Sequence, residues 1–198
     1  FDYHSLKSSK LLIRRAHSNE MFLSLDGVKR HLNTSMLVIA DDKQPVALAG
    51  IIGGSETEMT NATTSVFLES ATFNRTNNYQ TAQSLKLRTE ASIRFDKGLN
   101  PALCEIALRR ATHLIQKIAG GKVSKGIIDA SPNKFSAQQQ LSLTMNRLKK
   151  VLGISIPIAQ VEKILMSLGF GCDRKGRSSL TVTVPYWRSD ISIEDDLV

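Results

Sequence analysis

The stretch VALAGIIGG, residues 46–54, decides the predicted fold of the first part of the chain. Its apolar and small residues run without a charge into Gly53-Gly54, and such a run is typical of a central strand buried on both faces. The glycine pair either lets the backbone approach a ligand closely or makes a turn that requires positive φ. GIIGG lacks the spacing of the GxGxxG dinucleotide-binding motif, so no nucleotide site is predicted from it.

Shorter apolar runs on both sides of this stretch extend the predicted sheet. The pair Asp26-Gly27 between two of them is typical of a hairpin turn. SVFLESATF, residues 65–73, is predicted as a second central strand because apolar side chains fall on both of its faces. The remaining strands are predicted within KLLIRRA (10–16), MFLSL (21–25), VKRHL (28–32) and MLVIA (36–40).

Helices are predicted after these strands. A first helix is expected over about residues 77–87, and PALCEIALRRATHLIQKIAGG (101–121) predicts a longer one that ends at Gly120-Gly121. VSKGIIDAS (123–131) is predicted as a returning strand, and the polar SPNKFSAQQQ (131–140) as a linker. The apolar residues that recur at helical spacing in the long helix are Leu103, Ala107, Ala111, Leu114 and Ile118.

A small second domain is predicted after a boundary between about residues 131 and 141. LSLTMNRLKKVLG (141–153) and PIAQVEKILMSLGF (157–170) predict two amphipathic helices, and SLTVTVP (179–185) predicts a strand. The fold class is therefore α+β: a mixed sheet flanked by helices, then a helix pair with a strand that resembles a nucleic-acid-binding module but also suits plain docking. The residues predicted to face inward are Leu148, Leu152, Ile158, Val161, Leu165 and Leu168.

The composition limits the function classes. With 198 residues, 41% of them hydrophobic, the chain is long enough for a core, and its apolar runs are too short for a membrane span. A net charge of +8 favours a polyanionic partner such as nucleic acid. Cys104 and Cys172 are far apart and the four histidines lack metal-ligand spacing, so neither a disulfide nor a zinc site is predicted, and a reducing cytoplasm is expected. The sequence begins with Phe1 and is expected to be part of a longer chain.

Two features raise questions of chemistry. Glu69 lies in a predicted strand with two apolar faces, where a carboxylate needs either a structural ion pair or a role in lining a pocket. LRTEASIRFDKGLNP (87–101) is strongly polar and has almost no apolar repeat.

A group of acidic residues near the end of the chain is a further candidate. Asp190, Glu194, Asp195 and Asp196 could supply oxygen ligands to a cation such as Mg²⁺. The spacing of Ser192 and Asp195 also fits a capping box at the start of a helix, and spacing alone favours this interpretation over a metal site.

Four stretches taken together resemble the β subunit of bacterial phenylalanyl-tRNA synthetases, and the resemblance covers the whole chain. It implies an editing domain, the third and fourth modules of that family, over residues 1–133, and the fifth module over residues 140–198. The first is expected to be truncated at its N-terminus and the second at its C-terminus. The stretches are GIIGGSETEMTNATTSVFLESATF (50–73), LRTEASIRFDKGLNP (87–101), LGF (168–170) and VPYWRSDISIEDDL (184–197).

The resemblance implies a pocket that hydrolyses tRNA(Phe) mischarged with tyrosine. A synthetic pocket for phenylalanine cannot strongly reject an isostere that adds one hydroxyl, so a second site must check. No Ser-His-Asp or Cys-His nucleophile is predicted, so no catalytic residue is assigned and water is expected to attack the ester. Arg94 and Lys97 are expected to serve nearby phosphates or the domain's own ion pairs. The implied pocket residues are Gly53, Gly54, Glu69, Thr89 and Ala91.

The resemblance also implies partners and cofactors. These are tRNA(Phe) and an α subunit that uses ATP to charge tRNA with phenylalanine in an α2β2 enzyme; no membrane is involved. Asp190 and Asp196 match Mg²⁺ ligands whose companions, two glutamates, would follow Val198, so the site is expected to be incomplete. A histidine that the family carries just before Phe1-Asp2 is absent, and the chain alone is expected to be inactive. The alternatives are a basic scaffold without chemistry that docks tRNA or the α subunit, and a structural spacer.

Overall fold

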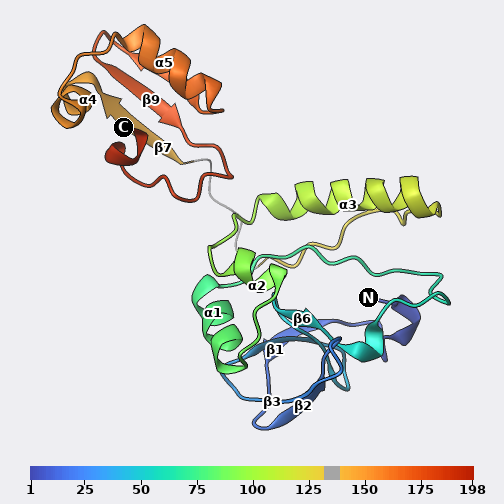
Figure 1. The fold of residues 1–198 in the computed structure, drawn as a ribbon. Helices are drawn as coiled ribbons and strands as arrows, with labels where there is room; N and C mark the ends of the chain where they lie inside the picture. Colours follow the sequence, from blue (N-terminus) through green and yellow to red (C-terminus); the bar gives the residue numbers. More distant parts are fainter. Residues whose placement is uncertain (132–138) are drawn as a thin grey trace. The chain divides into compact units, whose positions relative to one another are not determined.

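The chain forms two compact units, Phe1–Lys125 and Gly126–Val198, in a computed structural model that describes residues 1–131 and 139–198 (Figure 1). Each unit has its own sheet and its own buried apolar side chains. The predicted α+β class is confirmed. The predicted boundary and linker, between about residues 131 and 141, fall largely outside the described residues.

The first unit contains a four-stranded sheet in the order β1-β4-β5-β6 and a separate hairpin of β2 and β3. The hairpin turns at the predicted Asp26-Gly27, where Gly27 has a φ of +76°. The run 46–52 does not form one strand as predicted, because the chain reverses at Gly50 and returns as β6. The strands are β1 (Leu12–Arg15), β2 (Glu20–Leu23), β3 (Lys29–Leu32), β4 (Leu37–Ala40), β5 (Pro45–Leu48) and β6 (Ile52–Gly53).

The core of this unit lies on β4 and β5, which are the inner strands of the sheet. Val38 of β4 pairs in register with Leu48 of β5, and both side chains are buried. Phe22 and Leu32 of the hairpin belong to the same buried cluster. The apolar runs that predict these strands therefore also supply the side chains that hold them together.

Two predicted strands are wrong. Residues 65–73 run as an extended segment whose one recorded pairing is an isolated bridge between Val66 and Asp2, and Val66 is exposed. Residues 123–131 likewise contain no strand, and Ile128 is 91% exposed. Both segments have the side chains of strands. Residues 65–67 exchange backbone hydrogen bonds with Phe1 and Tyr3, but this pairing is too short to form a strand, and no ladder continues from it among the described residues.

Helices follow the sheet in sequence. They are α1 (Arg75–Ser84), α2 (Glu90–Phe95) and α3 (Leu103–Ala119), the last of which ends at Gly120 as predicted. The predicted inner face of α3 is only half-buried at Leu103, and Ile118 is 82% exposed. Neither α3 nor any other described helix is both long and apolar enough to cross a membrane.

The second unit is built on a three-stranded antiparallel sheet in the order β7-β9-β8. The prediction of a helix from residue 141 is wrong for its first residues, because Leu141 and Leu143 alternate with polar residues and pair with β9 in β7. Thr144 ends the strand and caps α4 by accepting a hydrogen bond from the Arg147 amide. The elements are β7 (Gln140–Thr144), α4 (Met145–Leu152), α5 (Ile158–Ser167), β8 (Gly171–Lys175), β9 (Ser179–Thr183) and the 3₁₀ turn η3 (Glu194–Leu197).

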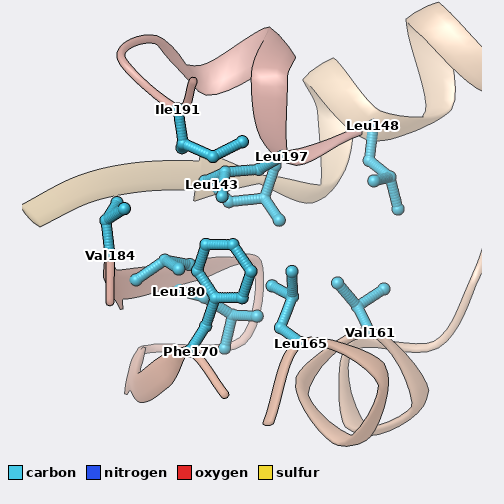
Figure 2. Close-up of a cluster of buried hydrophobic side chains, with 10 residues drawn as sticks. Leu143, Leu148, Val161, Leu165, Phe170, Leu180, Val184, Ile191 and Leu197 are labelled. Atoms are coloured by element: carbon cyan, nitrogen blue, oxygen red, sulfur yellow. The ribbon is translucent and has the colours of Figure 1, made fainter. Parts of the chain in front are cut away.

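Both helices of this unit pack on one face of its sheet. Figure 2 shows Leu143 and Leu180 from the sheet meeting Leu148 from α4 and Leu165 from α5. Of the residues predicted to face inward, Leu148, Val161 and Leu165 are buried, whereas Leu152 and Leu168 are exposed. Those two lie in the last turn or at the C-cap of their helices, where the chain already turns away from the core.

Replacing Leu180 by alanine is expected to destabilise the second unit by about 2–5 kcal/mol, because the fully buried side chain leaves a cavity. Leu168→Ala, at a position that is 56% exposed, is the matched control and should cost far less. Urea unfolding followed by circular dichroism measures both. Equal losses for the two variants would contradict the assignment of the core.

Candidate functional site

The first unit contains a hollow of about 500 Å³. The turn between β5 and β6, the extended segment 69–73, α2 and the first turns of α3 surround it. Most of its lining is apolar, and the rings of Phe73 and Phe95 pack against each other in it at a tilt of 57°, with their centroids 5.1 Å apart. Glu69 and Arg94 are the charged side chains among its described lining residues.

The turn at Gly50 joins these elements. Gly50 has a φ of +69°, and a Cβ atom there would lie 2.5 Å from Nδ2 of Asn78 and 2.7 Å from Cδ2 of Phe73. The carbonyl groups on either side of it are both used: Asn78 of α1 donates to Ala49 O at 3.2 Å, and the Thr89 hydroxyl donates to Ile51 O at 2.7 Å. Only glycine fits this position, and the turn thereby fixes α1 and the start of α2.

The two predicted glycines have different surroundings. Gly53 lines the hollow, whereas Gly54 does not. Neither has a positive φ, so the interpretation of this pair as a left-handed turn is wrong, and Gly50 has that conformation instead. A Cβ atom on Gly54 would lie 2.8 Å from Val46 O, so this glycine allows close backbone packing away from the hollow.

Of the two predicted residues at the start of α2, Thr89 has a structural role and Ala91 lines the hollow. The Thr89 hydroxyl accepts a hydrogen bond from the Ser92 amide, which caps α2, and donates one to Ile51 O, which anchors α2 to the turn. Its donor and its acceptor are therefore both used by the fold. Ala91 lines the hollow and Thr89 does not. The polar stretch 87–101 is thus explained in part by a capping box at the start of a short helix.

Glu69 lies on the extended segment and not in the predicted strand with two apolar faces. Glu69 is exposed as a whole residue, yet neighbouring atoms crowd its carboxyl group, and this local desolvation raises the pKa of Glu69 above its ordinary value. The amino group of Phe1 opposes the shift. Within the described residues no hydrogen bond or ion pair satisfies this carboxylate, so the structural ion pair considered from the sequence has no support there.

Sequence reasoning missed several residues of the hollow, notably Phe73, Phe95 and Arg94 as lining groups. A signal was available for α2. Ala91, Arg94 and Phe95 have the i, i+3, i+4 spacing that places side chains on one face of a helix. The shortness of α2 and its polar composition concealed that face.

The acidic residues at the end of the chain serve local structure. Asp190 pairs with Arg188 at 2.8 Å, and Asp196 accepts hydrogen bonds from the amides of Ser192 and Ile193. These amides hold the pKa of Asp196 below its ordinary value. The cap is therefore formed by Asp196 and not by the predicted pair of Ser192 and Asp195.

The described residues do not gather enough ligands for Mg²⁺. No cluster of three or more metal-binding side chains occurs among them, and the oxygens of Asp190 are directed at a guanidinium group. Magnesium prefers octahedral oxygen coordination, which a pair of engaged carboxylates does not supply.

Two family models match the chain. Residues 1–120 match the B3/4 domain and residues 141–198 match the tRNA synthetase B5 domain. Because the first match covers more than half of the sequence, the chain belongs to the B3/4 domain family, and a B5 domain follows in the same chain.

Over its full length the chain is similar to phenylalanine–tRNA ligase β subunits, which confirms the resemblance predicted from the sequence. It is 41% identical over 197 residues to that of Shouchella clausii, 39% over 210 residues to that of Dehalococcoides mccartyi (strain CBDB1) and 39% over 198 residues to that of Lactococcus lactis. The alignments cover 100% of this chain but only 24%, 26% and 25% of these relatives. The chain therefore spans about a quarter of their length.

A solved structure has a related fold. The crystal structure of an N-terminal fragment of the phenylalanyl-tRNA synthetase β-subunit from Pyrococcus horikoshii matches with a TM-score of 0.51 at 14% identity. The match covers 100% of this chain and 56% of that chain. At this identity the similarity supports the fold alone.

Because the pKa of Glu69 is raised, replacing this residue should increase the stability of the fold by an amount that depends on pH. In the window between its unfolded and folded pKa values the folded state binds more protons, so stability falls as the pH rises through that window. Glu69→Gln should therefore unfold at a higher temperature than the unchanged chain at pH 7, and the difference should vanish below roughly pH 4. Thermal unfolding across pH measures this, with Glu58→Gln, an exposed change outside the hollow, as the control. A pH-independent difference would show that the carboxylate is not desolvated.

The chain is expected to bind Mg²⁺ no more tightly than about 1 mM, because Asp190 and Asp196 already have partners. Isothermal titration with MgCl₂ measures this. Tighter binding that Asp190→Asn abolishes would prove the expectation wrong.

Proposed function

We propose that the unit formed by residues 1–125 hydrolyses tyrosine from mischarged tRNA(Phe) within the β subunit of a phenylalanine–tRNA ligase. One observation carries this proposal. An unpaired carboxylate, that of Glu69, stands at a largely apolar hollow whose volume suits a small organic group. The similarity to phenylalanine–tRNA ligase β subunits supports it, and Gly53 and Ala91 line the same hollow.

The chemistry of selection follows from that carboxylate. Tyrosine differs from phenylalanine by a hydroxyl group, which can donate a hydrogen bond to ionised Glu69 while the ring packs against Phe73 and Phe95. Phenylalanine would leave the carboxylate desolvated without a donor, a penalty of about 1–3 kcal/mol. This corresponds to about tenfold or greater preference for tyrosine. Since the pKa of Glu69 is raised, the preference should weaken at a less acidic pH than for an ordinary glutamate.

Hydrolysis is assigned to water and not to a protein nucleophile. No histidine is among the described residues that line the hollow, and the Ser70 hydroxyl donates to Cys104 O at 2.8 Å. The Thr72 hydroxyl contacts the Cys104 thiol at 3.1 Å, so neither hydroxyl has a base beside it. The unit would act by holding the ester in place for attack by water.

The wider role belongs to the same proposal. The β subunit would support ATP-dependent charging of tRNA(Phe) with phenylalanine by an α subunit, in a cytoplasmic α2β2 enzyme that uses ATP and Mg²⁺. The net charge of +8 suits an RNA partner. The alternative of a scaffold without chemistry shares these features, except for the role of Glu69.

Deacylation of Tyr-tRNA(Phe) by the intact ligase carrying this sequence tests the proposal. Glu69→Ala should lower kcat/KM for Tyr-tRNA(Phe) by about tenfold or more, since the donor hydroxyl loses its charged acceptor. Charging with phenylalanine should be unchanged. Glu58→Gln, an exposed acid of the same unit, is the control. Unchanged hydrolysis in Glu69→Ala would favour the scaffold.

A further inference from the structure

The hollow has charges of opposite sign that do not neutralise each other. Glu69 has no hydrogen bond or ion pair among the described residues and feels only the charge of the Phe1 amino group, while the Arg94 guanidinium pairs outside the hollow with Glu90. A ligand that suits both groups carries a hydroxyl donor at one point and an anion at another. The hollow, at about 500 Å³, is in the range that takes ligands larger than one amino-acid side chain.

Arg94 is held in place from two sides. The Thr89 hydroxyl ties the start of α2 to Ile51 O, and Phe95 at the end of α2 packs against Phe73. Because α2 is short, these anchors fix the Cα of Arg94 relative to the wall that carries Glu69, while its side chain stays 62% exposed. A long cation on a fixed stem at the edge of a hollow is suited to meet an anion that arrives from solvent.

The present partner of Arg94 can be exchanged at little cost. Its bond to Glu90 is an i, i+4 ion pair between side chains that are 62% and 83% exposed, a class that contributes little in water. A phosphate offers the planar guanidinium fork a stronger, bidentate partner. Lys97, the other cation considered from the sequence, does not line the hollow.

We infer that Arg94 binds a backbone phosphate at the 3′ end of the tRNA while the aminoacyl group occupies the hollow. This inference rests on the proposed function and adds a positioning contact to it. A phosphate contact at the rim would fix the strand that enters, so that the ester is placed over the apolar wall. Glu69 then selects the side chain and Arg94 sets the depth of entry.

The chain contains a matched control for Arg94. Arg109 forms an i, i+4 pair with Glu105 at 2.6 Å, the same length as the pair of Arg94 with Glu90, and both partners are similarly exposed. Arg109 does not line the hollow. Arg94→Gln and Arg109→Gln therefore each remove one charge and one i, i+4 ion pair. They differ in their relation to the hollow, and Arg94 also donates to the Glu90 carbonyl at 2.6 Å.

The test measures hydrolysis of Tyr-tRNA(Phe) by the intact ligase over a series of salt concentrations. Arg94→Gln should lower kcat/KM by about ten- to a hundredfold, as expected for loss of a charge-assisted hydrogen bond. The slope of log(kcat/KM) against log[salt] should fall by about 0.7, the contribution of one phosphate on a single strand. Arg94→Lys should keep the slope and still lower kcat, because the charge remains while the fork is lost. Arg109→Gln should match the unchanged enzyme.

Equal effects of the Arg94 and Arg109 changes, or no effect of either, would overturn the inference. If Glu69→Ala slows hydrolysis while Arg94→Gln does not, the inference fails and the proposed function stands. If the unchanged enzyme does not hydrolyse Tyr-tRNA(Phe), the proposed function fails. In that case the contact between Arg94 and a phosphate is tested by measuring the affinity for the RNA trinucleotide CCA. Arg94→Gln should weaken this binding about tenfold and Arg109→Gln should not. Equal binding by both variants would overturn the inference.

Discussion

The arrangement of the first unit depends on the absence of one methyl group, at Gly50. Its left-handed backbone reverses the chain between β5 and β6, and the space above it is filled by Asn78 and Phe73. The carbonyl groups of Ala49 and Ile51 are then free to receive donors from α1 and from the cap of α2. One residue without a side chain thus sets the sheet turn, the approach of both helices and the floor of the hollow.

The residues predicted for the site include some that stabilise the fold and one that does not. Thr89 and Gly54 serve packing and hydrogen bonding, so changing them would disturb the frame before it disturbed a ligand. Glu69 makes no such contribution, since desolvation raises its pKa and the amino group of Phe1 offsets that shift only in part. Residues of this kind are typical of sites where recognition has been kept at the expense of stability.

Periodicity and turn chemistry predicted much of the fold, because both act over a few neighbouring residues. The hairpin at Asp26-Gly27 and the long helix α3 follow directly from such local signals. The same local signals predict a strand over residues 65–73, and this prediction is wrong. Their side chains suit a sheet, but a strand also requires a partner edge, which no local pattern reveals. The pattern at Leu141 and Leu143 predicts part of the following helix and not a strand, because no helix-breaking residue separates the two elements there.

For the candidate site, the family resemblance indicated residues in and around one hollow, but not which of them line the hollow and which hold the fold together. Gly53, Glu69 and Ala91 line the hollow, and their role in a site remains a prediction, while Thr89 and Gly54 do not line it. That difference depends on the direction of the Thr89 hydroxyl, which donates to Ile51 O, and on the closeness of Val46 O to Gly54. Only three-dimensional structure supplies such information.

The two walls of the hollow are constructed in different ways. One is made by β5 and the turn that follows, whose backbone belongs to a hydrogen-bonded ladder. The opposite wall, residues 69–73, is extended but unpaired with any sheet, and it is held through contacts such as the Ser70 hydroxyl on Cys104 O. Substitutions in the second wall can therefore reshape the ligand that fits without breaking a ladder. The selectivity of the hollow can thus change while the hydrogen-bonded sheet that supports it stays intact.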